Sequence, residues 1–182
     1  MKIRVADITE KEKILESSTP ASTYPTLLQV QEAGEGTFAG PVDATLSIVR
    51  EYDHLKVKGR VVTRVVLTCS RCLTDFDFDI TSNFTIYLTK ATGTVEEDEV
   101  ELAEEDLLSV TYTGDEIDLT NEIAEQVLLE LPYKPLCKEA CLGLCPVCGV
   151  DNNSTVCGCM DSRPSMAFSS LGSFKVKPDK GE

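Results

Sequence analysis

The clearest pattern in the chain is an alternation of apolar and other residues with a period of two. In residues 42–49 the alternating apolar positions are Val42, Ala44, Leu46 and Ile48. Such a period is typical of a β-strand that is buried on one face only. We therefore expect an antiparallel strand over residues 42–49, followed by a turn at residues 52–54.

The same alternation continues over residues 55–69 and is longer there. One face of this expected strand is apolar, with Leu55, Val57, Val61, Val65 and Leu67. The other face carries Lys56, Lys58, Arg60 and Arg64, with Val62 and Val66 among them. Alternating apolar residues over 76–80 and 84–88 then predict either two more strands or one long bent strand.

Outside this region the pattern is weaker. Residues 1–16 indicate a short strand and then a charged helix or turn, and residues 17–41 indicate loop with a short strand at 27–30. Residues 107–112 are expected to form a strand. A helix is expected over about 119–131, capped by Asp118 or Thr120 and ended by Pro132. Its apolar residues at helical spacing are Ile123, Ala124, Val127, Leu128 and Leu131.

These elements predict an α+β fold dominated by an antiparallel β-sheet, with curling toward a barrel left open. One helix is expected to pack on the sheet. Three regions follow along the chain: a β-rich core domain at 1–136, a Cys-rich zinc module packed on the core at 137–160, and a tail at 161–182. The oligomeric state does not follow from the sequence.

Charge and hydropathy limit the classes of partner. The 182 residues are 42% apolar and carry a formal net charge of −14, which opposes general adhesion to nucleic acid or to an anionic membrane. No apolar run approaches the roughly 20 residues that span a bilayer. Charges interrupt the first fifteen residues, so no signal-peptide core is expected there. We therefore expect a cytoplasmic protein with no membrane partner, whose thiols stay reduced.

Residues 93–106 are strongly acidic. The acids are Glu96, Glu97, Asp98, Glu99, Glu101, Glu104, Glu105 and Asp106. Their spacing does not match the calcium-binding loop of an EF-hand. A solvated loop or helix face is therefore expected.

Eight cysteines carry the main chemical signal in the chain. They are Cys69, Cys72, Cys137, Cys141, Cys145, Cys148, Cys157 and Cys159. The first pair is C-x2-C, and the second group reads C-x3-C-x3-C-x2-C-x8-C-x-C. A C-x2-C turn directs two sulfurs at one ion, and zinc favours four such ligands in a tetrahedron. A glycine after the second cysteine, as in the sequence CPVCG at 145–149, relieves the strain of that turn. We therefore expect zinc as the cofactor.

Eight thiolates suffice for two four-cysteine sites. We expect a local site of Cys145, Cys148, Cys157 and Cys159, while Cys137 and Cys141 join Cys69 and Cys72 in a second site. One site with four spare thiols is an alternative division. Other chemistries are buried free thiols with one or two disulfides, or an iron–sulfur cluster, which four cysteines also ligate. A thioredoxin-like role is not expected, because the βαβ context is missing.

Three motifs together resemble the YceD-like family of bacterial and plastid proteins, which act in the accumulation of large-subunit ribosomal RNA. They are CSRCL at 69–73, EIDLTNEIAEQVLLELP at 116–132 and LCKEACLGLCPVCGVDNNSTVCGC at 136–159. The resemblance covers roughly residues 25–171. At 161–164 the family tends toward Asp-Pro-Arg, and this chain departs from it with Asp-Ser-Arg-Pro. The resemblance implies a role in processing or accumulating 23S rRNA during assembly of the large ribosomal subunit.

A non-catalytic role is expected from the residues themselves. The only histidine, His54, is expected to be an exposed turn residue, and no phosphate loop or nucleophile–base pair is present. No small-molecule substrate is expected either. A possible contact with an rRNA precursor is the basic strip, defined as Lys56, Lys58, Arg60, Arg64 and Arg71. The alternatives are that this strip is only solvated surface, and that the acidic segment recruits a basic protein of the large subunit without RNA contact.

Overall fold

The computed structural model describes residues 1–91 and 109–159. The acidic segment at 96–106 and the tail lie outside the described residues, so the expectations for them are not addressed. The elements, in chain order, are β1 (Lys2–Arg4), η1 (Val5–Asp7), β2 (Lys13–Pro20), η2 (Ala21–Thr23), α1 (Pro25–Glu32), β3 (Thr37–Phe38), β4 (Pro41–Glu51), β5 (His54–Thr68), β6 (Asp75–Lys90), β7 (Ser109–Tyr112), β8 (Glu116–Asp118) and α3 (Thr120–Leu129).

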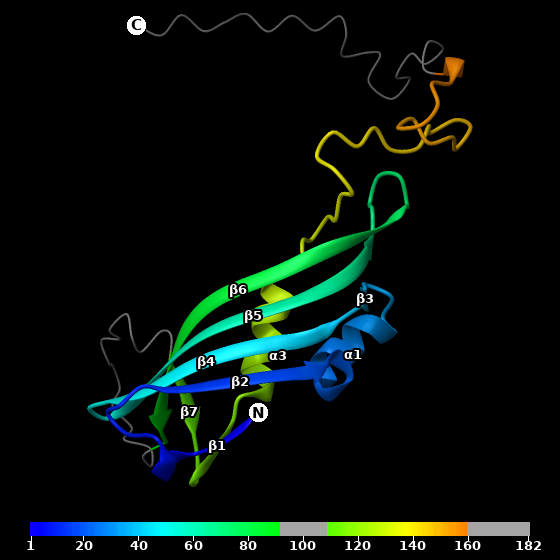
Figure 1. The fold of residues 1–182 in the computed structure, drawn as a ribbon. Helices are drawn as coiled ribbons and strands as arrows, with labels where there is room; N and C mark the ends of the chain where they lie inside the picture. Colours follow the sequence, from blue (N-terminus) through cyan, green and yellow to red (C-terminus); the bar gives the residue numbers. More distant parts are fainter. Residues whose placement is uncertain (92–108, 160–182) are drawn as a thin grey trace, which may run out of the picture.

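The main sheet has the strand order β2-β4-β5-β6-β7, and β3 pairs with β5 beyond the end of β4. All its pairings are antiparallel except that of β6 with β7, which is parallel. β1 and β8 form a separate two-stranded sheet. The expected antiparallel sheet is thus confirmed, and in the described part it is a long, curved, open sheet rather than a closed barrel (Figure 1).

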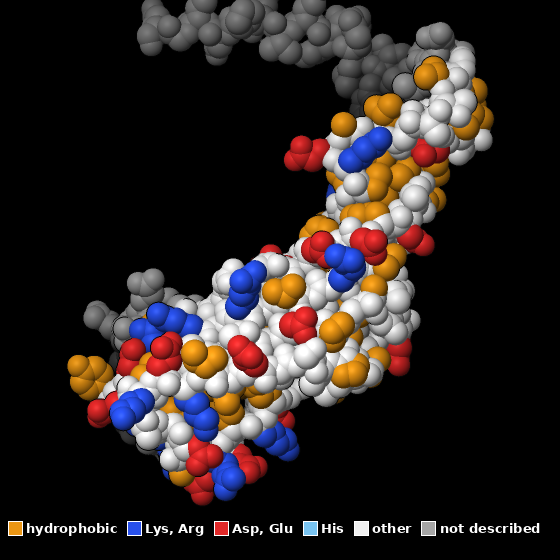
Figure 2. Space-filling model, viewed as in Figure 1, with side chains coloured by type: hydrophobic (Ala, Val, Ile, Leu, Met, Phe, Trp, Pro, Cys, Tyr) orange, Lys and Arg blue, Asp and Glu red, His pale blue; other side chains and the backbone are white. Residues whose placement is uncertain are grey.

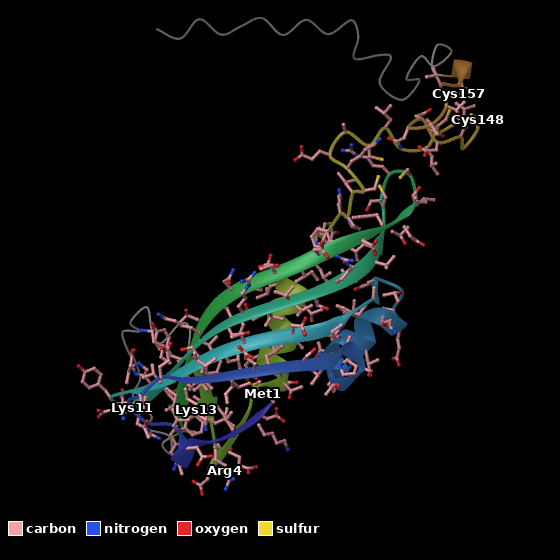
Figure 3. The ribbon with its side chains drawn as sticks, in the orientation of Figure 1. Met1, Arg4, Lys11, Lys13, Cys148 and Cys157 are labelled. Carbon is pink, nitrogen blue, oxygen red and sulfur yellow. The ribbon has the colours of Figure 1, made fainter. Side chains whose placement is uncertain are left out.

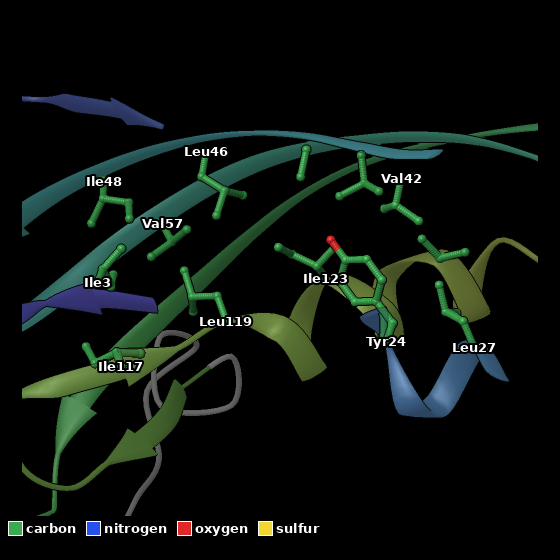
Figure 4. Packing of buried hydrophobic residues seen from close by; sticks show 14 of the residues in the cluster. Ile3, Tyr24, Leu27, Val42, Leu46, Ile48, Val57, Ile117, Leu119 and Ile123 are labelled. Carbon is green, nitrogen blue, oxygen red and sulfur yellow. The ribbon is translucent and has the colours of Figure 1, made fainter. Parts of the chain in front are cut away.

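The core lies between one face of the sheet and α1, α3 and the β1–β8 pair. The predicted apolar face of β5 is fully buried, and Ile123, Ala124 and Val127 of α3 pack against that face of the sheet (Figure 4). Asp118 accepts a hydrogen bond of 3.1 Å from the backbone N–H of Thr120, the first residue of α3. The N-cap position itself is Leu119, which makes no side-chain capping bond, so neither Asp118 nor Thr120 is the N-cap. In the part of the chain that the structure describes, no helix packs on the opposite, open face of the sheet.

Two expectations for the N-terminal region were wrong. Residues 27–30 belong to the helix α1, not to a strand; Pro25 occupies its first turn, where a fixed φ favours helix initiation. The fold therefore contains two α-helices within the described residues rather than one. Residues 13–20 form the strand β2, although its inward face holds only one large apolar residue, Leu15. The sequence left open whether residues 76–80 and 84–88 form two strands or one. They belong to one long strand, β6.

The Cys-rich segment extends beyond the tip of the β5–β6 hairpin (Figure 1). It contacts the hairpin through a small buried cluster of Cys69, Cys72 and Cys141, against which Phe76 and Leu136 pack. Within the described residues, no helix is long and apolar enough to cross a membrane.

Candidate metal centre

The tip of the β5–β6 hairpin is a turn that contains the first cysteine pair. The backbone N–H of Cys69 donates to Thr74 O at 2.9 Å, and that of Leu73 donates to Cys69 O at 2.9 Å. These bonds close a tight loop in which the sequence C-x2-C places Cys69 and Cys72 on one side. Leu73 has a φ of 59°, a left-handed conformation that is unfavourable for a residue with a Cβ atom.

The second C-x2-C turn has the same backbone pattern. Gly149 N–H donates to Cys145 O at 2.8 Å, and Gly149 has a φ of 74°. In addition, Val147 N–H points at Cys145 Sγ, with an N···S distance of 3.4 Å. Gly149 therefore relieves backbone strain where the sequence predicted it. Leu73 occupies the equivalent position of the first turn, and its positive φ strains the backbone there.

The hairpin cluster, defined as Cys69, Cys72, Cys137 and Cys141, joins the hairpin tip to the Cys-rich segment. All four sulfurs lie within 4.8 Å of one another. The Sγ atoms of Cys69 and Cys141 are 3.8 Å apart, and those of Cys72 and Cys137 are 3.7 Å apart. A Zn–S bond of about 2.3 Å gives a tetrahedral S···S edge of about 3.8 Å, whereas a disulfide requires about 2.05 Å. The measured separations therefore fit ligands of one ion.

The distal cluster, defined as Cys145, Cys148, Cys157 and Cys159, forms the second group. Its four sulfurs also lie within 4.8 Å of one another. Cys148 and Cys157 lie at the far end of the Cys-rich segment, remote from the sheet (Figure 3). Cys145 is buried, but Cys148 is exposed, so this group is more open to solvent than the hairpin cluster.

The structure thus groups the eight sulfurs into the two sets of four that the spacing predicted. None of the eight cysteines forms a disulfide, so the disulfide alternative does not describe this fold. Four sulfurs this close together match the spacing of ligands around a single ion. Each group has the donors and the spacing to hold one metal ion.

Hydrogen bonds and burial set the acidity of the thiols. A backbone N–H of Cys137 lowers the pKa of Cys69 to about 6, and one of Cys148 does the same for Cys145, also to about 6. Burial raises the pKa of Cys137 to about 12, and a hydrogen bond with the Cys148 thiol raises that of Cys159 to about 11. Four thiolates so close together repel one another, and a central cation would remove this obstacle to full deprotonation.

A short polar turn connects the two clusters, and the sequence analysis missed it. Asn153 Nδ2 lies 3.4 Å from Cys141 Sγ of the hairpin cluster, while Asn152 Oδ1 lies 3.9 Å from Cys157 Sγ of the distal cluster. Asp151 orients Asn153, accepting hydrogen bonds from its backbone N–H at 2.9 Å and from its amide at 2.6 Å. The only sequence signal was a run of five polar residues, 151–155, between two ligand pairs, which does not identify a role.

Four residues of the basic strip, Lys56, Lys58, Arg60 and Arg64, lie on the open face of the sheet, and two of the four are neutralised by acidic neighbours. Lys56 Nζ lies 3.2 Å from a carboxylate oxygen of Glu51, and Arg64 Nε lies 2.7 Å from one of Asp79. Lys58 and Arg60 are exposed, and neither forms an ion pair in the part of the chain that the structure describes. Figure 2 accordingly shows acidic and basic side chains interspersed on this face.

Arg71 serves the Cys-rich segment rather than the open face. Its guanidinium donates to the carbonyl oxygens of Glu139 at 3.3 Å and Cys141 at 2.8 Å. A Cβ on Gly143 would lie 3.0 Å from Arg71 O, so the two segments are in close contact here. Arg71 thereby helps to hold the Cys-rich segment on the hairpin tip.

The expectation for His54 was wrong, since this side chain is only 15% exposed. It is the first residue of β5, and it packs edge-on against the ring of Tyr87 with the ring centroids 5.2 Å apart. Its Nδ1 lies 3.2 Å from Asp53 Oδ1. The histidine is thus held in the end of the sheet, far along the sheet from either cysteine cluster.

Comparison with known proteins places the chain in a family. The family model described as "Large ribosomal RNA subunit accumulation protein YceD" matches residues 57–175. A chloroplastic protein of Arabidopsis thaliana, named "Large ribosomal RNA subunit accumulation protein YCED homolog 1", is 28% identical over 176 residues, which cover 84% of this chain and 53% of that protein. Its namesake in Zea mays is 28% identical over 137 residues, covering 63% and 47% of the two chains.

A bacterial relative extends the comparison. An uncharacterized protein of Mycobacterium tuberculosis is 32% identical over 109 residues, which cover 60% of this chain and 50% of the relative. The chain thus spans about half the length of the curated relatives that it matches. No solved structure matches it significantly. Because the family model covers more than half of the sequence, including both cysteine clusters, the resemblance is confirmed, and this chain belongs to the YceD family of large ribosomal RNA subunit accumulation proteins.

Proposed function

We propose that the chain is a non-catalytic zinc-binding factor that acts in the accumulation of 23S rRNA and the assembly of the large ribosomal subunit. The observation that carries the zinc assignment is the pair of four-sulfur groups, each with its sulfurs within 4.8 Å. Membership of the YceD family, and the names of the plant relatives, support the process.

A zinc ion bound by four cysteines has no open coordination position, so it stabilises a fold rather than activating a substrate. Bound zinc would supply the positive charge that holds four thiolates together. In the hairpin cluster it would link residues 65 and 72 positions apart in sequence. Such a role requires reduced thiols, which supports the cytoplasm as the proposed compartment.

The direct partner has two candidates. The first is an rRNA precursor that contacts Lys58 and Arg60, the strip residues without an ion pair in the described part of the chain. The second is a basic protein of the large subunit, bound through acidic residues. The ion pair between Arg64 and Asp79 favours this second candidate, because it removes a cation from the strip.

The metal assignment is tested by native mass spectrometry of the chain purified without oxygen. We expect two zinc ions in the wild type and one in each of the variants Cys69→Ser and Cys145→Ser. Ser154→Ala, which changes no ligand, should keep both. Hydrogen exchange should show that Cys145→Ser loosens only the Cys-rich segment, whereas Cys69→Ser also loosens the end of the hairpin. Metal-free folded protein, or protein loaded only with iron, would contradict the assignment.

The cellular role and the RNA contact need separate measurements. Depleting the protein should lower the ratio of large-subunit to small-subunit rRNA, and an unchanged ratio would refute the role. The affinity for precursor rRNA is measured as a function of salt concentration. The slope of log K against log salt should become shallower by about one unit for each phosphate contact that Lys58→Glu or Arg60→Glu removes. Lys11→Glu and Lys134→Glu change the charge equally at exposed sites elsewhere. If all four variants bind alike, the RNA candidate is wrong.

A further inference from the structure

Among the described residues, the outer edge of β6 has no strand partner along most of its length. β6 pairs with β5 from end to end, but β7 covers only the part from Tyr87 to Lys90. Within the described residues, no backbone hydrogen bond joins residues 75–86 to anything except β5. Figure 1 shows this strand along the border of the main sheet, with no strand beyond its middle part. Such an edge is a ready template for an added strand.

The direction of the free backbone groups follows from the pairing. Cys69 N–H donates to Thr74 O, so residues 69 and 74 form a hydrogen-bonded pair. Hydrogen-bonded and non-hydrogen-bonded pairs alternate in an antiparallel ladder, so the even-numbered residues of β6 bond to β5. The odd-numbered residues point their N–H and C=O groups outward. Ala91, one residue past β6, fits this parity because its N–H donates to Tyr112 O at the end of β7.

The side chains beside this edge differ on the two faces. Asp75, Asp77 and Asp79 lie exposed in a row on the open face. Asp75 accepts the hydroxyl of Thr68, and Asp79 is paired with Arg64, but Asp77 has no hydrogen bond or ion pair in the described part of the chain. On the opposite face, the aromatic residues Phe76, Phe78 and Phe84 are only partly buried.

We propose that residues 75–86 of β6 bind an extended segment of a partner protein in which Lys or Arg alternates with apolar residues. The added strand would bond to the odd-numbered residues of the edge, place its cations beside the acidic row and cover the half-buried aromatic rings. This inference rests on the proposed function, and it specifies the partner as a basic protein segment.

Charge favours a basic peptide segment at this edge over an RNA strand or a second copy of the chain. An RNA strand would bring its phosphates against the acidic row. A second copy of the chain would bring an identical acidic row and a further net charge of −14. Acidic residues on an edge strand also discourage self-association, which agrees with an edge reserved for a basic partner.

The test blocks the edge without touching the bonds to β5. Residue 81 is odd-numbered and exposed, so Thr81→Pro removes one outward N–H, and Thr81→Ala is the matched control that keeps it. The probe is a labelled ten-residue peptide of alternating lysine and valine. We expect equal affinity for the wild type and Thr81→Ala, and a loss of about tenfold or more for Thr81→Pro. A glutamate–valine peptide should not bind.

A second pair of variants covers the case in which Thr81→Pro fails to fold. Asp77→Lys should weaken peptide binding, whereas Asp43→Lys, an exposed acid on β4 away from this edge, should not. Equal binding by both members of either folded pair, or no binding by the wild type, overturns the proposal. The proposal is also overturned if the chain forms a dimer that Thr81→Pro abolishes, or if RNA binds at this edge. Zinc content and rRNA accumulation are measured independently, so failure of the proposed function is distinguishable from failure of the edge site.

Discussion

Gly59, in the middle of β5, is predicted to lose stability even when it is replaced by alanine. It lies directly opposite Phe84 on β6, and the phenyl ring rests on its Cα. A Cβ at residue 59 would lie 2.1, 2.4 and 2.8 Å from three atoms of that ring. Carbon atoms normally approach to about 3.5–4.0 Å, so the ring cannot keep its position in Gly59→Ala.

The expected magnitude is a balance of two effects. Overpacking of this kind costs about 1–3 kcal/mol. Alanine recovers about 0.5–1 kcal/mol, because glycine loses more conformational freedom in a strand. The net loss is therefore up to about 2.5 kcal/mol, which lowers Tm by up to about 10 °C for a protein of this size.

The assay is urea unfolding with zinc held at a fixed saturating concentration, since bound metal shifts apparent stability. Gly40→Ala is the control, because no atom lies within 4 Å of its added Cβ; it should be neutral or stabilising by up to about 1 kcal/mol. In a Phe84→Ala background, Gly59→Ala should lose its cost. The reasoning is refuted if Gly59→Ala proves as stable as Gly40→Ala.

Two further predictions concern strain and pH. Leu73→Gly should raise stability by about 1 kcal/mol, and Gly149→Ala should lower it by a similar amount, because both residues have positive φ; thermal unfolding of the zinc-loaded variants measures both. Hydrogen bonds from Thr120 lower the pKa of Asp118 below its usual 3.8, so its stabilisation is present above that pH and is lost as pH falls through the lower value. Unfolding between pH 6 and pH 2 should therefore show a weaker acid dependence in Asp118→Asn than in the exposed control Asp115→Asn, and equal profiles would contradict this.

The sequence predicted the elements whose patterns are long. The alternation over β5 extends for fifteen residues, and its apolar face is the buried face. In contrast, the four residues at 27–30 are too few to separate a strand from a helix, and α1 follows from Pro25 and from burial of Leu27. β2 was missed because it is held mainly by backbone pairing with β4, which a polar sequence can make as well as an apolar one.

For the candidate site too, the features encoded in local spacing could be predicted, and those that depend on the three-dimensional structure could not. The spacing C-x2-C encodes a local turn, and eight thiols divide into two sets of four, so both groups were accessible to reasoning from the sequence. The neutralisation of Arg64 depends on the register that sets it opposite Asp79, and the strain at Leu73 depends on a backbone angle. Neither is encoded in local spacing, and the contact of Asn153 with Cys141 likewise exists only in three dimensions.

The position of the hairpin cluster connects the metal with the open edge. Cys72 precedes β6 by only three residues, and Cys137 and Cys141 come from the segment that follows α3. Phe76, the second residue of β6, packs against this cluster, so its order depends on the four sulfurs staying together. The far part of the same edge, around Phe84, is instead fixed by the ring of Phe84 against Gly59. A metal ion in the hairpin cluster would therefore stabilise the beginning of the edge, where the three acidic residues lie, while the sheet core stabilises its end.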